Sequence, residues 1–299
     1  EGFVGFVDAL DDTWRGLSVT MPLKEQAAVC GVPDADVSLT GAANTVVPGP
    51  VRHVYNTDIV GLMDALRVEG LHELNVATII GNGATARSAA VALARSGVRV
   101  IEVQGRNPDR LAEFRDWAEH ACDVEVQPRS LGAPLDPASD VLISTTPSAA
   151  LQGRLDTLAI ELCPALRGVF DVIYHPWPTP LAQRASEAGL TMLSGLDLLV
   201  HPADMEGLGV SLLQASAAAV PIVTSRAGGL PEAVQDGVTG ILCPPGDVAA
   251  LTTAIDRLAG DAALRARYGA AGRARILAEF SIDAMVDGNL RIYRQVLGR

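Results

Sequence analysis

The feature that most constrains the fold is the run of residues 75–97, NVATIIGNGATARSAAVALARSG. Six residues typical of a buried strand lead into a glycine turn, and an alanine-rich helix pattern follows until the next glycine. Gly81 allows a tight bend, Gly83 lets the backbone approach a ligand, and Ala86 permits close helix–strand contact. Strand, turn and helix in this order predict a βαβ unit whose helix N-terminus offers free N–H groups to phosphate.

Strand and helix patterns alternate on both sides of this run. Such alternation is typical of an α/β fold with a doubly wound, Rossmann-like parallel sheet. We expect helices at 59–70, 87–97, 108–121 and 180–189. We expect strands at 75–80, 98–105, 123–128, 140–146, 168–174 and 191–195.

The second strand of this unit ends in Gln104-Gly105-Arg106, where an NAD site would carry an acidic residue. Arg106 and Arg110 can instead meet a 2′-phosphate, with Asn107 between them. NADP is therefore the predicted cofactor, and the alternative is an ordinary turn followed by two solvated arginines. The turn residues expected to bind it are Gly81, Asn82, Gly83, Ala84 and Thr85.

Among 22 arginines the chain has one lysine, Lys24. A guanidinium keeps its proton, whereas an amine can share or donate one. A single lysine in such a chain therefore suggests a chemical role, although chance in an arginine-rich composition is the alternative.

Composition excludes several classes of function. The net charge of −12 opposes a surface that follows nucleic-acid phosphates, and no apolar run reaches the roughly 18 residues of a membrane span. The start, EGFVGFVDALDDTW, is acidic where a signal peptide is basic, so we expect a cytoplasmic protein with a small-molecule substrate. The four cysteines lie far apart, which predicts reduced thiols without a disulfide framework or a metal site. They are Cys30, Cys122, Cys163 and Cys243.

Seven motifs over about residues 1–200 resemble shikimate dehydrogenases in order and spacing. They are SVTMPLK (18–24), GAANTVV (41–47), NTD (56–58), GNGATAR (81–87), STTP (144–147), DVIYHPWPTPL (171–181) and SGLDLLVH (194–201). The resemblance implies reversible, NADPH-dependent reduction of 3-dehydroshikimate to shikimate. It also implies a substrate-binding lobe in front of the dinucleotide-binding domain.

The resemblance assigns roles to single residues. Lys24 and Asp58 match the catalytic pair that flanks the reacting hydroxyl, and a lysine beside a carbonyl can supply the proton that the reduction needs. Thr20, Asn44 and Tyr174 match substrate contacts of the family. Ser18 is a further expected substrate contact, at a position where the family usually has asparagine. Val172 and Gly195 match residues that line the nicotinamide, and Thr145 lies at a strand end near the cofactor.

Two departures from the family pattern bear on activity. The family's opening strand and helix, with a serine motif that holds the substrate carboxylate, have no counterpart, so we expect a truncated lobe whose sheet has an exposed edge. Pro202 stands where the family has a substrate-binding glutamine. We therefore expect cofactor binding to be retained and substrate binding to be weakened.

From about residue 201 the chain resembles the C-terminal part of a family-four retaining glycosyltransferase of the GT-B fold. The motifs are MEGLGVSLLQASAAAVPIVTS (205–225), GGLPE (228–232) and DGVTGILCPPGD (236–247). The resemblance implies a nucleotide-sugar site with two glutamates that have seven residues between them. Glu206 matches the first, but Gln214 stands in place of the second and has no charge.

We therefore expect three parts: a truncated substrate lobe (1–58), an NADP-binding domain (59–200) and a Rossmann-like, helical C-terminal segment (201–299). The charge distribution supports a boundary near 200, since residues 1–200 hold 25 acidic and 14 basic residues and the rest hold ten and nine. Strands at 221–225 and 239–243 would extend the first sheet or build a separate layer. The functional alternatives are a dehydrogenase with impaired activity, a glycosyltransferase fragment and an inactive chimera.

Overall fold

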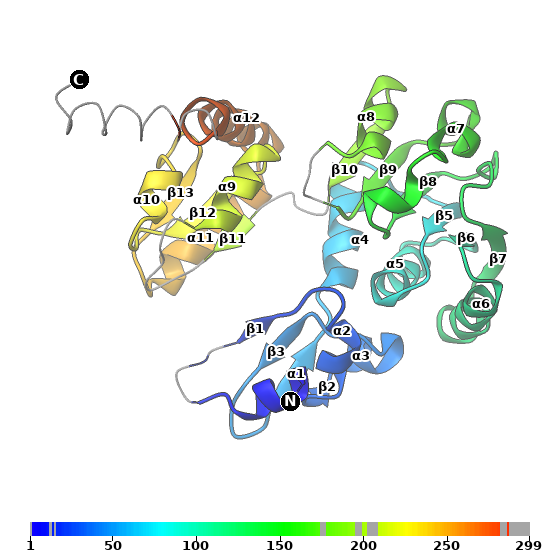
Figure 1. The fold of residues 1–299 in the computed structure, drawn as a ribbon, viewed down its shortest axis with the longest axis horizontal. Coiled ribbons are helices and arrows are strands. Elements are labelled where there is room, and N and C mark those ends of the chain that lie inside the picture. Colours follow the sequence, from blue (N-terminus) through cyan, green and yellow to red (C-terminus); the bar gives the residue numbers. More distant parts are fainter. Residues whose placement is uncertain are drawn as a thin grey trace. The chain divides into compact units, whose positions relative to one another are not determined.

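A computed structural model describes residues 2–11, 14, 16–173, 178–194, 199–201, 209–281 and 286. The chain forms two compact units. The first contains Glu1–Ile173 and Pro180–Leu193, and the second contains Tyr174–Thr179 and Ser194–Arg299. Each unit has its own β-sheet structure and its own hydrophobic clusters (Figure 1).

A six-stranded sheet in the order β10-β9-β8-β5-β6-β7 dominates the first unit. Its five strands from β9 to β7 pair in parallel. The chain runs outward from β5 to β7, crosses back to β8 and continues to β10, which is the strand order of a Rossmann fold. The strands are β5 (Val76–Ile80), β6 (Val100–Gly105), β7 (Glu125–Ser130), β8 (Val141–Ser144), β9 (Gly168–Asp171) and β10 (Thr191–Ser194).

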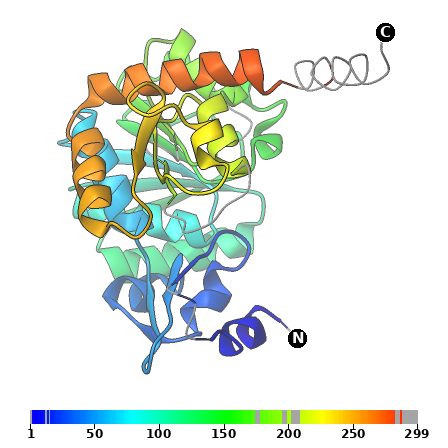
Figure 2. The same cartoon turned by 90° about the vertical axis from the view of Figure 1, so that its left-hand side faces the viewer.

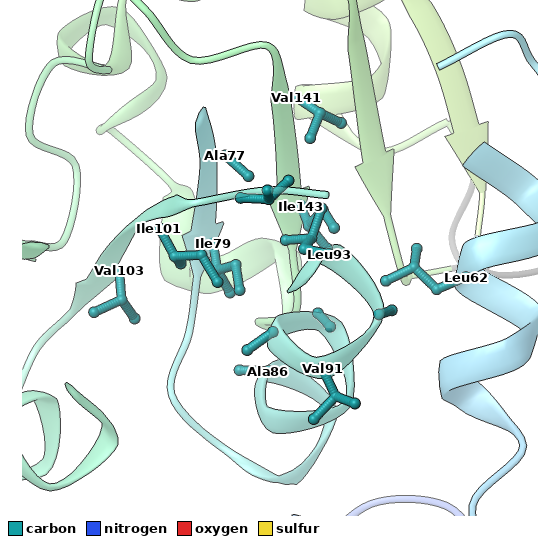
Figure 3. Packing of buried hydrophobic residues seen from close by; sticks show 14 of the residues in the cluster. Leu62, Ala77, Ile79, Ala86, Val91, Leu93, Ile101, Val103, Val141 and Ile143 are labelled. Atoms are coloured by element: carbon teal, nitrogen blue, oxygen red, sulfur yellow. The ribbon is translucent and has the colours of Figure 1, made fainter. Parts of the chain in front are cut away.

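Helices cover both faces of this sheet, as the alternating pattern predicts. One cluster packs α4, α5 and α6 against Ile79, Ile101 and Ile143, and Figure 3 shows α5 beside these isoleucines. A second cluster packs the segment 151–166 and α8 against Ile80 and Leu142, which face the other way. The helical elements are α4 (Asp58–Val68), α5 (Ala84–Arg95), α6 (Pro108–Cys122), η1 (Ser148–Leu151), α7 (Leu155–Leu158), η2 (Ile160–Leu162) and α8 (Pro180–Glu187).

Residues 2–58 form a smaller N-terminal lobe within the first unit. Its four strands have the order β1-β3-β4-β2, so the two-residue strand β1 lies at an edge, as the sequence predicts. The strands are β1 (Leu17–Ser18), β2 (Val32–Pro33), β3 (Thr45–Val47) and β4 (His53–Tyr55). Three short helices, which the sequence pattern does not indicate individually, complete the lobe: α1 (Phe3–Asp8), α2 (Lys24–Ala28) and α3 (Ala35–Thr40).

A separate parallel sheet in the order β11-β12-β13 forms the second unit. The sequence leaves open whether strands 221–225 and 239–243 extend the first sheet or build a separate layer, and in the structure they build a separate layer. One apolar cluster joins Ile222 and Leu242 to α9 and α10, and another joins Val223 and Cys243 to α11 and α12. The elements are β11 (Leu199–His201), α9 (Val210–Ala217), β12 (Ile222–Ser225), α10 (Leu230–Ala233), β13 (Gly240–Cys243), α11 (Val248–Ala259) and α12 (Ala262–Glu279).

Strand β11 spans the boundary expected at residue 200. Its residues pair with β12, so residues 199–201 belong to the sheet of the second unit. The sequence that resembles the end of a dehydrogenase therefore supplies a strand next to the glycosyltransferase-like strands. Within the part of the chain that the structure describes, no helix is both long and apolar enough to cross a membrane.

Candidate active site

Lys24 and Asp58 lie side by side in the first unit. Lys24 is the first residue of α2 and Asp58 the first residue of α4. The Lys24 Nζ donates a hydrogen bond to the Asp58 Oδ2 over 2.6 Å. Their side chains are 13% and 26% exposed, so the pair is largely shielded from water while a ligand can still reach it. An ammonium and a carboxylate that are 34 residues apart in sequence thus form one ion pair.

A polar network orients the Asp58 carboxylate. The Asn44 Nδ2 donates to the Asp58 Oδ1 over 2.7 Å, so both carboxylate oxygens accept hydrogen bonds. The Asn44 Oδ1 in turn accepts from the Thr57 N–H over 3.1 Å. Asn44 is a substrate contact by the sequence prediction, and in the structure it also holds the carboxylate. Thr57 was not singled out, although it lies within the NTD motif.

Ser18 and Thr20 lie on the segment that leads into α2. Both are exposed, and Ser18 is the last residue of the edge strand β1. Among the described residues neither hydroxyl has a hydrogen-bond partner, so both can bind a ligand. Tyr174, the fourth expected substrate contact, lies outside the described residues.

The dinucleotide-binding turn reaches the Lys24–Asp58 pair through Thr85. This threonine lies in the first turn of α5, and its Oγ1 accepts a hydrogen bond from the Lys24 Nζ over 3.3 Å. The sequence analysis expected Thr85 only as a cofactor contact. The lysine therefore bonds both to the N-terminal lobe and to the turn predicted to hold a dinucleotide.

The turn itself requires glycine at its first position. Gly81 has a φ of +113°, and a Cβ there would lie 2.3 Å from the Thr145 Oγ1. Gly83 is the N-cap of α5 and faces open space, so backbone N–H groups at the helix start are accessible. Ala84 is the first residue of this helix. Thr145 closes the other side of the turn, where its hydroxyl donates to the Ile80 carbonyl over 2.9 Å.

Polar atoms without partners surround this turn. The Asn82 Nδ2, the Thr146 Oγ1 and the Ser148 Oγ are buried and have no hydrogen-bond partner among the residues that the structure describes. A buried polar group without a partner is destabilising, so such atoms often mark a ligand site. Together with the free N–H groups at the start of α5, they fit the phosphates and sugars of a dinucleotide.

The residues expected at the 2′-phosphate lie at the end of β6 and the start of α6. Asn107 is the N-cap of α6, and its Oδ1 accepts from the N–H groups of Asp109 and Arg110. Arg106 and Arg110 are exposed, and among the described residues neither has an ion-pair partner. Arg110 lines a cavity of about 620 Å³ that also includes Asn82 and Gly83.

Of the two residues expected at the nicotinamide, Val172 lies within the described residues. Val172 directly follows β9, where its N–H donates to the Ser144 carbonyl over 3.0 Å and its half-buried side chain packs on the main core. Gly195 lies outside the described residues. The structure thus gives Val172 a place at the carboxyl edge of the sheet, next to the strand that carries Thr145.

Contacts between the N-terminal lobe and α5 form a further group that the sequence analysis did not foresee. The Arg87 Nε donates to the Thr40 carbonyl over 2.6 Å, and the same guanidinium pairs with Glu25, the neighbour of Lys24. The buried Asn56 Nδ2 donates to the Ser88 Oγ over 3.0 Å. These bonds hold α2 and α3 to the helix that carries Thr85. Arg87 closes the GNGATAR motif, which is the sequence signal for it.

Of the two nucleotide-sugar residues expected in the second unit, one lies within the described residues. Gln214 lies on α9 and is half-buried. Glu206 lies outside the described residues. The short helix α10 follows Gly228, which has a φ of +52°, and Gly229, its N-cap, as the GGLPE motif indicates.

The four cysteines are free thiols. Burial raises the pKa of Cys122 to about 11, and burial also raises the pKa of Cys30, Cys163 and Cys243. Such thiols are poor nucleophiles at neutral pH. In the part of the chain that the structure describes, no group of three His, Cys, Asp or Glu side chains is placed to hold a metal ion.

Cys122 should therefore be alkylated slowly in the native protein. At about pH 8 we expect iodoacetamide to modify it about tenfold or more slowly than an ordinary thiol, because little thiolate is present. Mass spectrometry of peptides from a time course measures the rate, and urea-unfolded protein is the control. Equal rates for native and unfolded protein would contradict the burial of this thiol.

Comparisons with known proteins agree with the geometry. A shikimate dehydrogenase (NADP(+)) from Rhodopseudomonas palustris strain BisB18 is 33% identical over 208 residues, which are 68% of this chain and 74% of that protein. The crystal structure of Mycobacterium tuberculosis shikimate dehydrogenase is 33% identical with a TM-score of 0.55, and the match covers 72% of this chain and 76% of that one. A shikimate 5-dehydrogenase from Mycobacterium fortuitum is 32% identical with a TM-score of 0.52 over 64% of this chain and 71% of that one.

A different family matches the later part of the chain. The model for glycosyl transferases group 1 matches residues 183–275, starting upstream of the boundary expected at residue 200. This match covers less than a third of the chain, whereas the dehydrogenase match covers about two thirds of it. The chain belongs to the shikimate dehydrogenase family, and a segment similar to glycosyl transferases group 1 is joined to it.

Proposed function

We propose that the first unit catalyses the reversible reduction of 3-dehydroshikimate to shikimate with NADPH. The observation that carries this proposal is the Lys24–Asp58 ion pair, which Thr85 links to the first turn of α5. The same chain belongs to a family whose curated members are named for shikimate and NADP(+). NADP is therefore the proposed cofactor.

The proton chemistry follows from the positions of the two catalytic residues. When bound, the reduced nicotinamide supplies a hydride to the carbonyl carbon of the substrate. As the C=O π bond breaks, negative charge develops on the oxygen, and the Lys24 ammonium donates the proton that completes the hydroxyl. The Asp58 carboxylate holds the amine through its Oδ2 while Asn44 fixes the other oxygen. In the reverse direction the Lys24 amine accepts the hydroxyl proton.

The remaining assignments are part of the same proposal. Substrate contacts are assigned to Ser18, Thr20, Asn44 and Tyr174. Exposed hydroxyls at Ser18 and Thr20 and the position of Asn44 beside Asp58 support them. Cofactor contacts are assigned to Gly81, Asn82, Gly83, Ala84, Thr85, Arg106, Asn107, Arg110, Thr145, Val172 and Gly195. A cytoplasmic location is also proposed, and the four free thiols support it.

Asp58→Asn tests this assignment in the full chain. The amide keeps the side-chain shape but no longer pairs with the ammonium, so we expect kcat to fall about 10²-fold. The assay follows NADPH absorbance with 3-dehydroshikimate, and then shikimate with NADP⁺. Asp64→Asn, an exposed aspartate on the same helix, is the matched control and should keep wild-type activity.

Two outcomes would count against the proposal. If Asp58→Asn and Asp64→Asn have the same kcat, Asp58 is not part of the reacting pair. If the wild-type chain binds NADPH by fluorescence titration but reduces no 3-dehydroshikimate, the inactive-chimera alternative holds.

The match to glycosyl transferases group 1 supports a second candidate function for the second unit. We propose nucleotide-sugar binding without transfer, through Glu206 and Gln214. Calorimetric titration of the full chain with UDP-glucose and GDP-mannose tests it, and Glu206→Gln should abolish any binding. No heat change with either donor in the wild type would remove this candidate for both nucleotides.

A further inference from the structure

A second cavity lies at the carboxyl ends of β6 and β7. It measures about 500 Å³, and three arginines line it: Arg106, Arg129 and Arg154. The other lining residues are Gly105, Pro108, Leu111, Pro128, Ser130 and Leu131. No carboxylate lines the cavity, so its lining carries three positive charges, and the buried Glu102 behind Arg129 offsets part of them.

The guanidinium groups have few partners in the protein. Arg129 faces Glu102 at 3.7 Å, and half of the arginine side chain remains exposed. That distance is too long for a strong hydrogen bond, so the Arg129 N–H groups remain available to a ligand. Within the described part of the chain, the Arg154 guanidinium donates one long hydrogen bond of 3.4 Å, to the Ala150 carbonyl. Arg106 has no ion-pair partner among the described residues.

Buried polar contacts fix the wall of this cavity. The fully buried Gln104 accepts from the Gly132 N–H over 3.0 Å and donates to the Ala133 carbonyl over 3.0 Å. The loop after β7 is thereby held to β6. Gly132 has a φ of +85°, and the stem of Arg154 covers it so closely that a Cβ would lie 2.9 Å from the arginine Cδ. Arg154 is thus held over the loop.

The position relative to the dinucleotide turn indicates the ligand. Strand β6 lies next to β5, which leads into Gly81. A Cβ added to Gly105, the last residue of β6, would lie 3.7 Å from the Asn82 Cγ. A dinucleotide whose pyrophosphate lies at this turn places its adenosine ribose at the end of the next strand. The three arginines line the cavity at the carboxyl ends of β6 and β7.

We propose that Arg129 and Arg154 complete, together with Arg106, the binding site for the 2′-phosphate of the cofactor, and that they increase selectivity for NADPH over NADH. This inference rests on the proposed function, because it assumes that a dinucleotide occupies the turn. A phosphate monoester has acceptor oxygens for several N–H donors from different directions, and three guanidiniums from three separate segments of the chain supply them. Arg129 and Arg154 thus join Arg106 in this cavity, while Arg110, the other arginine that the sequence indicates, lines the first cavity.

Binding measurements test the two added arginines without requiring turnover. We expect Arg129→Met and Arg154→Met each to weaken NADPH binding about tenfold in fluorescence titrations, because each removes a charge-assisted hydrogen bond. NADH binding should change less than about twofold, since it has no 2′-phosphate. Calorimetry with 2′,5′-ADP and 5′-AMP should give the same contrast.

Arg115→Met is the matched control, because Arg115 lies on α6, pairs with Asp116 and does not line the cavity. Equal losses for NADPH and NADH, or unchanged NADPH binding in both variants, would overturn the inference. Inorganic phosphate distinguishes a general anion pocket: if it competes as well as 2′,5′-ADP does, the site does not recognise the nucleotide. If the arginine variants lose NADPH binding but not NADH binding, and the wild type reduces no 3-dehydroshikimate, only the proposed function is refuted.

Discussion

Replacing Lys24 with methionine is expected to lower kcat for 3-dehydroshikimate reduction about 10³-fold, while the Kd for NADPH changes less than about twofold. The variant keeps most of the side-chain volume but removes the proton donor. Its Nζ is the group that bonds to both Asp58 and Thr85, and no second lysine exists in the chain to replace it. Steady-state kinetics and NADPH fluorescence measure the two quantities separately.

A fall in kcat without a change in NADPH affinity distinguishes a proton donor from a residue that only supports the fold. A residue that merely supports the fold would affect both, because the Thr85 partner of Lys24 lies in the first turn of the cofactor helix. A residue that donates a proton in the transition state affects kcat and kcat/KM together and leaves cofactor binding intact. Thermal unfolding of the variant checks that the first unit is still folded.

Lys24→Arg separates proton donation from simple charge. The guanidinium can keep a pairing with Asp58, but it holds its proton too tightly to donate one efficiently. We therefore expect kcat of Lys24→Arg to remain at least about 10²-fold below wild type. If Lys24→Arg retains activity within tenfold of wild type, Lys24 acts by charge alone and the proposed proton transfer is wrong.

The dinucleotide-binding domain could be predicted from sequence because its signals are local. The strand β5, the turn at Gly81 and the helix α5 follow one another without interruption, and glycines bound the segment on both sides. Buried strands of a parallel sheet read as continuous apolar runs, and the helices between them are long enough to show their period. The observed strand order confirms the α/β, Rossmann-like fold class.

The N-terminal lobe was predicted less completely. Helices α1, α2 and α3 contain five or six residues each, which is less than two turns, so no 3.6-residue period can develop. Its strands contain two or three residues. Lys24 and Asp58 were identified through motif resemblance, because periodicity carries no information about pairs 34 residues apart.

The contacts that sequence reasoning missed depend on tertiary structure. Arg87 bonds to Thr40 and Glu25 only because α5 packs beside the N-terminal lobe. Arg129 and Arg154 line one cavity with Arg106 although they lie 23 and 48 residues from it in sequence. The sequence alone shows Arg129 and Arg154 as ordinary surface arginines, whereas Arg87 closes the GNGATAR motif. The assignments of Tyr174, Gly195 and Glu206 stay predictions, since these residues lie outside the described part of the chain.

Gly269→Ala is expected to destabilise the second unit by about 3 kcal/mol or more. Gly269 lies in α12, the long orange helix of Figure 2, where a Cβ would come 1.8 Å from the Ala219 carbonyl oxygen. That oxygen belongs to backbone in the turn between α9 and β12, where Ala219 has a φ of +59°. Backbone cannot move aside as a flexible side chain can, so α9 and α12 must separate.

Gly272→Ala in the same helix is the matched control. Its nearest neighbour is the Ser216 Oγ at 3.4 Å, which is ordinary contact, so the added methyl group fits without displacing backbone. Because alanine favours helix over glycine, we expect this variant to be unchanged or stabilised by up to about 1 kcal/mol. Hydrogen exchange measured on peptides from α9, β12 and α12 reports the stability of the second unit alone.

The same pair of variants tests whether the two units fold independently. The first unit has its own sheets and hydrophobic clusters, so NADPH binding should survive Gly269→Ala even when exchange in α12 becomes fast. If Gly269→Ala abolishes NADPH binding as well as unfolding the second unit, the dehydrogenase fold requires the glycosyltransferase-like segment. Equal exchange in Gly269→Ala and Gly272→Ala would instead show that the close approach of α12 to Ala219 does not limit stability.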